Sequence, residues 1–388
     1  MTEVREKGKI YLHFYLFEKE GKTVAEARFL YRQTYDAIRR RIEEGIYGPS
    51  SLLPTEGALC REFHVSAITV KKALALLTEE GLVRRVPGKG TIVLPVPAGS
   101  LAGERPAPAA ASRIGLVLEH VSTPFGLEML YRLDQEAEEA GLKLDIRFSY
   151  SDQKKESQEI DFLLREGVRG LLIMPCRGEH YNTAILRLVV NGFPIVLLDK
   201  KLEGLCLPSV RTENREGAAR LTRYLAEKGC RRIAMITSAE RGTTSLQERE
   251  QGFFGALREA NLEPFAVVRV SGGELLRNLP SAQAIETLSA WLAGEGKQAD
   301  GIVCLEYGFV PALFAAMRAC GRSLGGSLRV CCFDEDYLAP QGPLLTHVKQ
   351  DEAAIAHEAM ALLRRELETG MVTEEECRVP GRFVEAAE

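Results

Sequence analysis

The segment 30–94 constrains this chain most, because its pattern predicts three short helices followed by a two-stranded hairpin. Thr55 directly precedes the second helix, and its hydroxyl is a good N-cap acceptor for an unpaired backbone N–H. The hairpin carries a Gly-Lys-Gly tip. This arrangement is typical of a winged helix–turn–helix, which inserts one helix into a DNA major groove. The first helix is expected from apolar side chains at helical spacing, namely Tyr35, Ile38, Ile42 and Ile46.

The third helix is the candidate recognition helix, and the segment around it is basic. Residues 30–93 hold ten Lys and Arg against seven Asp and Glu, whereas the whole chain has a net charge of −4. A basic domain on an acidic remainder indicates phosphate binding at this end. Charge runs such as Arg39–Arg41 are more often plain solvated faces, but here they accompany a turn, a helix and a wing. The expected DNA contacts are Thr55, Ser66, Thr69, Lys71, Lys72, Gly88, Lys89 and Gly90.

Several motifs of this segment match one family. They are Leu30-Tyr31-Arg32-Gln33, Leu53-Pro54-Thr55-Glu56, Glu80-Gly81-Leu82-Val83 and Gly88-Lys89-Gly90-Thr91. On these motifs the segment resembles the winged helix–turn–helix of GntR-type transcription regulators. The family usually has DNA-contacting arginines where this chain has Gly57-Ala58 and Ala67. The resemblance therefore implies the docking mode on double-stranded DNA, but not the usual operator sequence.

The whole chain is long enough for more than one domain, with 388 residues of which 45% are hydrophobic. No stretch is long and apolar enough to cross a bilayer, and the N-terminus does not lead into a signal-peptide pattern. The nine cysteines are scattered among apolar residues, which is typical of reduced, buried thiols in the cytoplasm. Residues 1–29 form an unassigned aromatic-rich extension, and residues 95–112 form a Pro/Ala-rich linker.

From residue 113 to residue 388, short apolar strands alternate with amphipathic helices such as 127–140 and 216–228. Continuous apolar strands with helices between them predict an α/β fold with a doubly wound parallel sheet. Ligands of such folds bind at the carboxyl ends of the strands. The expected strands are 114–118, 142–148, 170–174, 195–199, 232–236, 266–270, 301–305 and 328–333.

Motifs spread along residues 113–388 match a second family. Three of them are Arg249-x-x-Gly252-Phe253, Phe333-Asp334-Glu335 and Leu345-Thr346-x-Val348-x-Gln350. On these motifs the segment resembles the effector-binding and dimerisation domain of LacI/GalR regulators, which is related to periplasmic sugar-binding proteins and has two lobes. Glu306-Tyr307 replaces the Asn-Asp that this family commonly has. By motif position, the resemblance implies effector contacts by Phe125, Arg177, Arg249, Glu306, Asp334 and Gln350.

The chemistry of these residues suits a sugar. A sugar presents many hydroxyls, so its site needs buried groups with two hydrogen-bonding atoms beside an apolar face. Asp334 is able to accept from two hydroxyls, and Arg249 and Gln350 are able to donate. Each residue also has a plainer interpretation. Asp334 is otherwise a turn cap, and Arg249 is otherwise a surface ion pair with Glu248 or Glu250.

Together these patterns predict a ligand-responsive transcription regulator, most simply a repressor, with operator DNA and a carbohydrate effector as partners. A homodimer is expected through helix 127–140, which carries Met129, Leu130 and Leu133 beside Tyr131. The alternative is a sugar-active enzyme carrying a DNA-binding domain. Against it, the chain shows no Gly-x-Gly-x-x-Gly and no Gly-x-Ser-x-Gly motif, and the wing tip lacks the residues of a P-loop. No cofactor, metal or membrane partner is expected.

Overall fold

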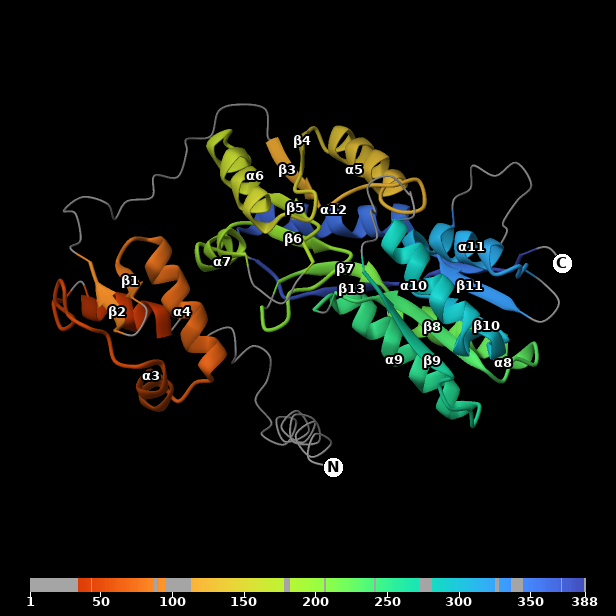
Figure 1. Cartoon of the computed structure of the whole chain (residues 1–388). Helices are drawn as coiled ribbons and strands as arrows, with labels where there is room; N and C mark the ends of the chain where they lie inside the picture. The colour runs from red at the N-terminus through yellow and green to blue at the C-terminus, as the bar shows by residue number, and fades with distance from the viewer. Residues whose placement is uncertain are drawn as a thin grey trace. The chain divides into compact units, whose positions relative to one another are not determined.

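The computed structural model describes residues 34–42, 44–86, 89–94, 113–177, 182–205, 207–240, 242–271, 281–324, 328–335, 345–370 and 372–386 (Figure 1). They form a small N-terminal domain and a larger domain with two lobes, and each is described by itself. The predicted extension 1–29 and linker 95–112 lie outside these residues. Within the described part of the chain, the eight cysteines are unpaired, and no helix is long and apolar enough to cross a membrane.

The N-terminal domain has the predicted winged helix–turn–helix fold. Its elements are a helix over residues 34–42, α3 (Glu56–Phe63), α4 (Ala67–Glu79), β1 (Val83–Val86) and β2 (Gly90–Val93). The two strands pair antiparallel and form the wing. Thr55 caps α3 as predicted, because its Oγ1 accepts from the Ala58 N–H at 3.2 Å. The local signals of the sequence therefore agree with the structure in this domain.

The first helix is shorter than its apolar spacing predicts. Gly45 has a left-handed backbone with φ of +76°, and its N–H bonds to the Ile42 carbonyl at 3.1 Å. Ile46 lies in the bend that follows and is 64% exposed, so its predicted place on the buried face was wrong. The core of the domain is formed by Tyr35, Ile38, Leu59, Val70, Leu74, Leu77, Leu82 and Val93.

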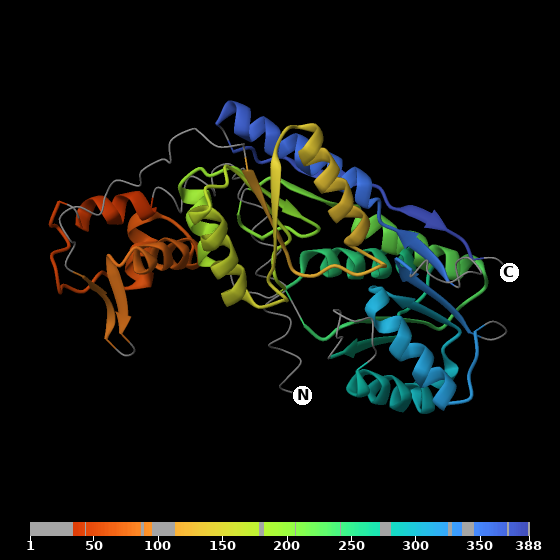
Figure 2. The ribbon, with the colours of Figure 1, turned by 90° about the horizontal axis from the view of Figure 1, so that it is seen from above.

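The first lobe of the larger domain is built on a six-stranded parallel sheet in the order β13-β7-β6-β5-β3-β4. Its strands are β3 (Arg113–Leu118), β4 (Lys143–Phe148), β5 (Leu171–Ile173), β6 (Ile195–Leu198), β7 (Ser209–Thr212) and β13 (Glu376–Val379). Helices α5 (Leu127–Glu139) and α12 (Glu352–Thr369) pack on one face (Figure 2). Helix α6 (Gln153–Arg165) lies on the other face, beside α7 (Thr183–Val190).

Helix α5 is the helix predicted to form the dimer contact, but its apolar side packs into the core of the first lobe. Met129 and Leu133 are fully buried against the sheet and α12. The prediction that these two side chains face a second copy was therefore wrong, because the same spacing that places them together also places them in the core. Tyr131 lies on the opposite side of the helix and is 64% exposed.

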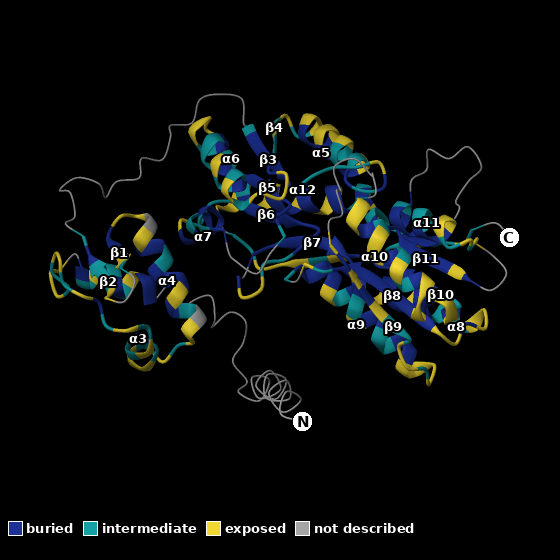
Figure 3. Ribbon diagram, viewed as in Figure 1, coloured by how far each residue is buried: buried dark blue, intermediate teal, exposed yellow. Residues whose placement is uncertain are grey.

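The second lobe repeats this design in the order β14-β12-β11-β10-β8-β9. Its strands are β8 (Ile233–Ser238), β9 (Ala266–Val270), β10 (Gly301–Cys304), β11 (Arg329–Phe333), β12 (Thr346–Lys349) and β14 (Arg382–Val384). Helices α8 (Asn214–Glu227) and α9 (Thr244–Glu259) cover one face, and α10 (Ala282–Ala293) and α11 (Val310–Ala319) cover the other. Figure 3 shows the strands buried between exposed helix faces.

The sheets agree with the predicted α/β class, with two differences. All eight predicted strands are present, but the short strands β7, β12, β13 and β14 were not predicted. Strand β14 also pairs antiparallel with β12, so the second sheet is not wholly parallel. The chain passes between the lobes after β7, after β12 and after β13. These passages bring the carboxyl ends of strands from both sheets to one cleft.

Candidate functional site

All six predicted effector-binding residues line one cleft of the larger domain. Five of them follow the carboxyl ends of strands, where ligands of such folds bind. Phe125 and Arg177 come from the first lobe, after β3 and β5. The second lobe contributes Arg249 from α9 and, after its strands, Glu306, Asp334 and Gln350. The other lining residues are His120, Ser122, Pro124, Met174, Asp199, Lys200, Ser245, Leu246, Tyr307 and Gly308.

Asp334 and Gln350 are held together at the ends of the neighbouring strands β11 and β12. The Asp334 carboxylate accepts from the Gln350 backbone N–H at 3.0 Å and from its Nε2 at 2.6 Å. Asp334 therefore binds the residue that follows the neighbouring strand β12. The alternative that Asp334 only caps its own turn is wrong. Burial raises the pKa of Asp334 to about 6, although the charge of Arg249 opposes this shift. At neutral pH the carboxylate is mostly ionised and able to accept from hydroxyls.

Arg249 supports this pair from inside the second lobe and is only 5% exposed. Its Nε, Nη1 and Nη2 donate to Asn214 Oδ1 at 2.7 Å, to the Leu305 carbonyl at 2.6 Å and to Gln350 Oε1 at 3.1 Å. The alternative of a surface ion pair with Glu248 or Glu250 is wrong, because these two carboxylates bind other arginines. Arg249 thus fixes the amide of Gln350, which in turn fixes Asp334.

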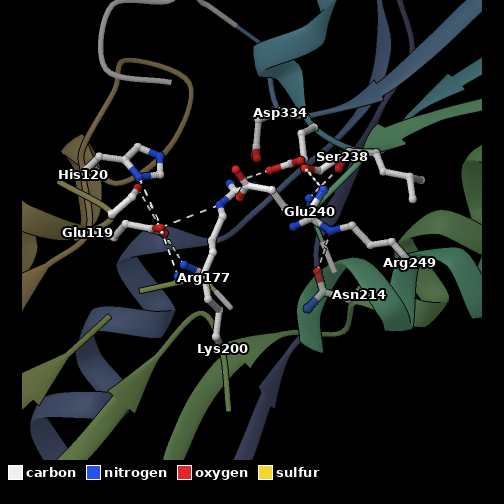
Figure 4. A network of polar contacts seen from close by, with 12 residues as sticks. Glu119, His120, Arg177, Lys200, Asn214, Ser238, Glu240, Arg249 and Asp334 are labelled. Atoms are coloured by element: carbon white, nitrogen blue, oxygen red, sulfur yellow. Dashed lines mark hydrogen bonds and ion pairs between the residues drawn. The ribbon is translucent and has the colours of Figure 1, made fainter. Parts of the chain in front are cut away.

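A buried glutamate organises the wall of the cleft that belongs to the first lobe. Figure 4 shows the Glu119 carboxylate between His120, Arg177 and Lys200. It accepts from Lys200 Nζ and from Ser151 Oγ, the latter at 2.9 Å. Burial alone would raise the pKa of Glu119, but the charges of Lys200 and Arg177 outweigh burial and lower it to about 2. Burial lowers the pKa of His120 to about 4, so this ring is neutral at pH 7.

Arg177 and Glu306 meet across the cleft and join its two lobes. Arg177 Nη2 donates to Glu306 Oε1 at 2.6 Å, and the two side chains are 12% and 11% exposed. Burial would raise the pKa of Glu306, but the charge of Arg177 outweighs it and lowers this pKa. Glu306 Oε2 and Arg177 Nε are buried without a hydrogen-bond partner among the described residues. Each of these two atoms is therefore short of one hydrogen bond within the described part of the chain.

Phe125 and Tyr307 supply aromatic surface to the cleft. Both side chains are half-buried: Phe125 packs against the core of the first lobe, and Tyr307 packs against that of the second. Aromatic faces of this kind cover the apolar side of a sugar ring. Tyr181, a further aromatic residue of this domain, lies outside the described residues.

Sequence reasoning missed several lining residues, among them His120, Asp199, Lys200 and Ser245. The first three come just after β3 and β6. Applying the strand-end rule to every predicted strand would have found them. Ser245 lies in the first turn of α9 and no motif or strand end marks it. Glu119, the buried centre of this wall, had the same strand-end signal.

The N-terminal domain places the predicted DNA contacts around α4 and the wing. Lys71, Lys89 and Gly90 are exposed. Lys72 is 6% exposed. Gly88 lies outside the described residues.

Two of the predicted DNA contacts also cap helices. Thr55 is the N-cap of α3, and Ser66 is the N-cap of α4. Ser66 Oγ accepts from the Thr69 N–H at 3.2 Å and lies 2.9 Å from Thr69 Oγ1. The two capping hydroxyls therefore stabilise the ends of the helices that a DNA backbone would approach.

Comparison with known families agrees with both parts of this structure. The profile of bacterial regulatory proteins of the gntR family matches residues 30–93. The profile of periplasmic binding proteins and the sugar-binding domain of the LacI family matches residues 111–274. A profile of the periplasmic binding protein-like domain matches residues 222–385. The matches cover the N-terminal domain and both lobes.

Several similar proteins are transcription regulators. An arabinose metabolism transcriptional repressor from Geobacillus stearothermophilus is 27% identical over 53% of this chain and 55% of that repressor. The HTH-type transcriptional regulator GalR from Salmonella typhimurium is 26% identical over 65% of this chain and 72% of GalR. The crystal structure of the Cra regulator from Pseudomonas putida, in complex with fructose 1-phosphate, has a TM-score of 0.61 at 20% identity. The matched region covers 71% of this chain and 99% of the Cra chain. An identity of 20% shows only that the two proteins share a fold.

A winged helix–turn–helix joined to a two-lobed binding domain defines a class, the effector-controlled DNA-binding transcription regulators. Within this class, the chain combines a DNA-binding domain of the gntR family type with an effector-binding domain of the LacI and periplasmic binding protein type.

Proposed function

We propose that this chain is a repressor whose binding to operator DNA is modulated by a carbohydrate bound between its lobes. The observation that carries the proposal is the cleft, where Asp334, Gln350 and Glu306 present paired polar atoms beside the aromatic rings of Phe125 and Tyr307. The name of one relative supports a sugar, since it is a repressor of arabinose metabolism. We place its action in the cytoplasm, where its DNA target lies.

The test of this proposal is operator binding titrated with sugars. Duplexes that the full chain selects from a random pool serve as the operator, and affinity is measured by fluorescence anisotropy with and without each sugar. A sugar that changes operator affinity, and that is recovered unaltered, supports a regulator. A sugar consumed with turnover would instead support the alternative of an enzyme carrying a DNA-binding domain.

Lys89→Ala is expected to weaken binding to every duplex by a similar factor. Lys89 is exposed at the tip of the wing, where it is placed to neutralise one phosphate. Losing one such contact should reduce the slope of log affinity against log salt by about one per half-site. Lys297→Ala, which removes an exposed lysine of the effector domain, is the matched control and should leave the slope unchanged. An unaltered slope in Lys89→Ala would show that the wing does not contact phosphate.

The regulator is also expected to act as a homodimer, because a two-fold protein reads the two half-sites of a palindromic operator. Tyr131 of α5, which is 64% exposed, is the side chain that we expect at the contact. Light scattering at micromolar concentration should give about twice the chain mass of 42.9 kDa. Tyr131→Glu should lower this mass toward that of one chain. A monomer with and without DNA would contradict the dimer.

A further inference from the structure

The cations of the cleft are engaged by the protein itself. Arg177 donates to Glu306 and lies 3.8 Å from Glu119. Lys200 donates to Glu119 and, at 3.0 Å, to a backbone carbonyl. Arg249 donates to the side-chain amide oxygens of Asn214 and Gln350 and to the Leu305 backbone carbonyl. Its guanidinium also lies 3.8 Å from the centre of a phenylalanine ring. A ligand that enters the cleft therefore finds each of these cations in contact with groups of the protein, with Arg177 Nε the donor that lacks a hydrogen-bond partner among the described residues.

Among the described residues in and around the cleft, positively charged side chains do not outnumber carboxylates. The cations are Arg177, Lys200 and Arg249, and the carboxylates are Glu119, Asp199, Glu306 and Asp334. Burial favours protonation of Asp199, because it raises the pKa of this group. Even then the remaining carboxylates match the cations in number. An anionic ligand would lose its hydration here without gaining an uncompensated positive charge.

Glu306 offers the ligand an acceptor that is fixed in place. Arg177 holds Oε1, and the charge-assisted contact sets the orientation of the carboxylate. Oε2 lies in the same buried site without a hydrogen-bond partner among the described residues. A carboxylate oxygen accepts from hydroxyl or amino groups, and it repels a phosphate or a second carboxylate.

We propose that the Arg177–Glu306 pair selects an uncharged, polyhydroxylated effector, such as a free sugar, over its phosphorylated or carboxylated counterpart. Glu306 Oε2 accepts from a hydroxyl of the effector, and the negative charge of Glu306 excludes an anion from that position. Because the pair joins the two lobes, this selection takes place where the lobes meet. The inference rests on the proposed function, since it names the class of effector for the same cleft.

The test is calorimetric binding to the full chain with matched free and phosphorylated sugars. The panel contains ribose, arabinose, xylose, fructose, glucose and galactose, with the phosphates of ribose, fructose and glucose. At least one free sugar should bind. Any phosphate in the panel should bind at least about tenfold more weakly than its free sugar, because the carboxylate of Glu306 repels the phosphate group.

Glu306→Gln tests the pair directly, because glutamine keeps the size and an acceptor but removes the charge. The preference for free over phosphorylated sugar should fall by about tenfold in this variant. Glu250→Gln is the matched control. It breaks an ion pair with Arg269, at 2.8 Å, within the second lobe and away from the cleft, and should leave the preference unchanged.

Three outcomes would overturn the inference. A phosphate that binds more tightly than its free sugar and changes operator affinity would refute it, while the proposed function would stand. An unchanged preference in a Glu306→Gln variant that melts like the wild type would refute the role of the pair. No binding by any free sugar of the panel would refute the inference together with the carbohydrate part of the proposed function.

Discussion

Gly252→Ala is expected to destabilise the effector-binding domain by about 3 kcal/mol. Gly252 lies on α9 where this helix meets α8, and a Cβ added there would lie 2.0 Å from the Arg215 carbonyl oxygen. The obstacle is backbone, so no side-chain rotation relieves it, and the two helices must separate. Alanine also favours helix by roughly 1 kcal/mol, which offsets only part of this cost. The measurement is urea unfolding followed by circular dichroism.

Gly255→Ala is the matched control on the same helix. A Cβ at Gly255 meets nothing within 4 Å. The substitution should therefore stabilise the domain by up to about 1 kcal/mol, through helix propensity and a less flexible unfolded chain. The two alanines are thus expected to have opposite signs. Similar effects of both would show that α8 and α9 do not pack as closely as the structure has them.

The same packing matters for the site, because Gly252 lies one turn after Arg249. Close approach of the two helices lets Arg249 reach Asn214, the first residue of α8, at 2.7 Å. Separating the helices would lengthen this contact and release Gln350. Gly252→Ala should therefore also weaken the effector response at temperatures where the variant is still folded.

The N-terminal domain could be predicted closely because its signals are local. Thr55 and Ser66 mark helix starts by their chemistry, and the wing follows from two short strands on either side of the Gly-Lys-Gly sequence. The misplaced residue depended on more than spacing. Ile46 continues the helical period, but Gly45 ends the helix first.

The cleft could be predicted in part, because strand ends and motifs mark residues one at a time. Asp334, Gln350 and Arg249 were identified in this way and do lie together. Their hydrogen bonds to one another could not be predicted, since they depend on the exact positions of two strands and a helix. The ion pair of Arg177 and Glu306 could not be predicted from the sequence for the same reason. These residues are 129 positions apart and belong to different sheets, so no local pattern connects them.

Asp334→Ala is expected to abolish the effector response, while operator affinity without effector stays near that of the wild type. The variant removes the carboxylate that would accept from effector hydroxyls and leaves both donors of Gln350 unpaired. Each lost partner costs about 1–3 kcal/mol, which corresponds to a loss of affinity of about 5- to 150-fold. Operator binding titrated with the sugar found by calorimetry measures this loss. Glu263→Ala, at an exposed carboxylate of the same lobe, is the control.

Asp334→Asn separates loss of the site from loss of the fold. Asp334 has a left-handed backbone with φ of +58°, which asparagine tolerates better than alanine. Asparagine keeps one acceptor but places an amide where a charged oxygen met the Gln350 side chain. Its affinity for the effector should therefore lie between those of the wild type and Asp334→Ala. A response of both variants at the sugar concentration that suffices for the wild type would show that the effector binds elsewhere.

The pH dependence of effector binding gives a second readout of the same carboxylate. Burial raises the pKa of Asp334 to about 6, so the group accepts from hydroxyls above this pH and is protonated below it. Effector affinity of the wild type should fall as the pH drops through 6. Glu352, whose pKa burial raises to about 7, titrates nearby and would add to the decline. Asp334→Asn retains Glu352 but cannot titrate at position 334, so the part of the decline that disappears in this variant belongs to Asp334.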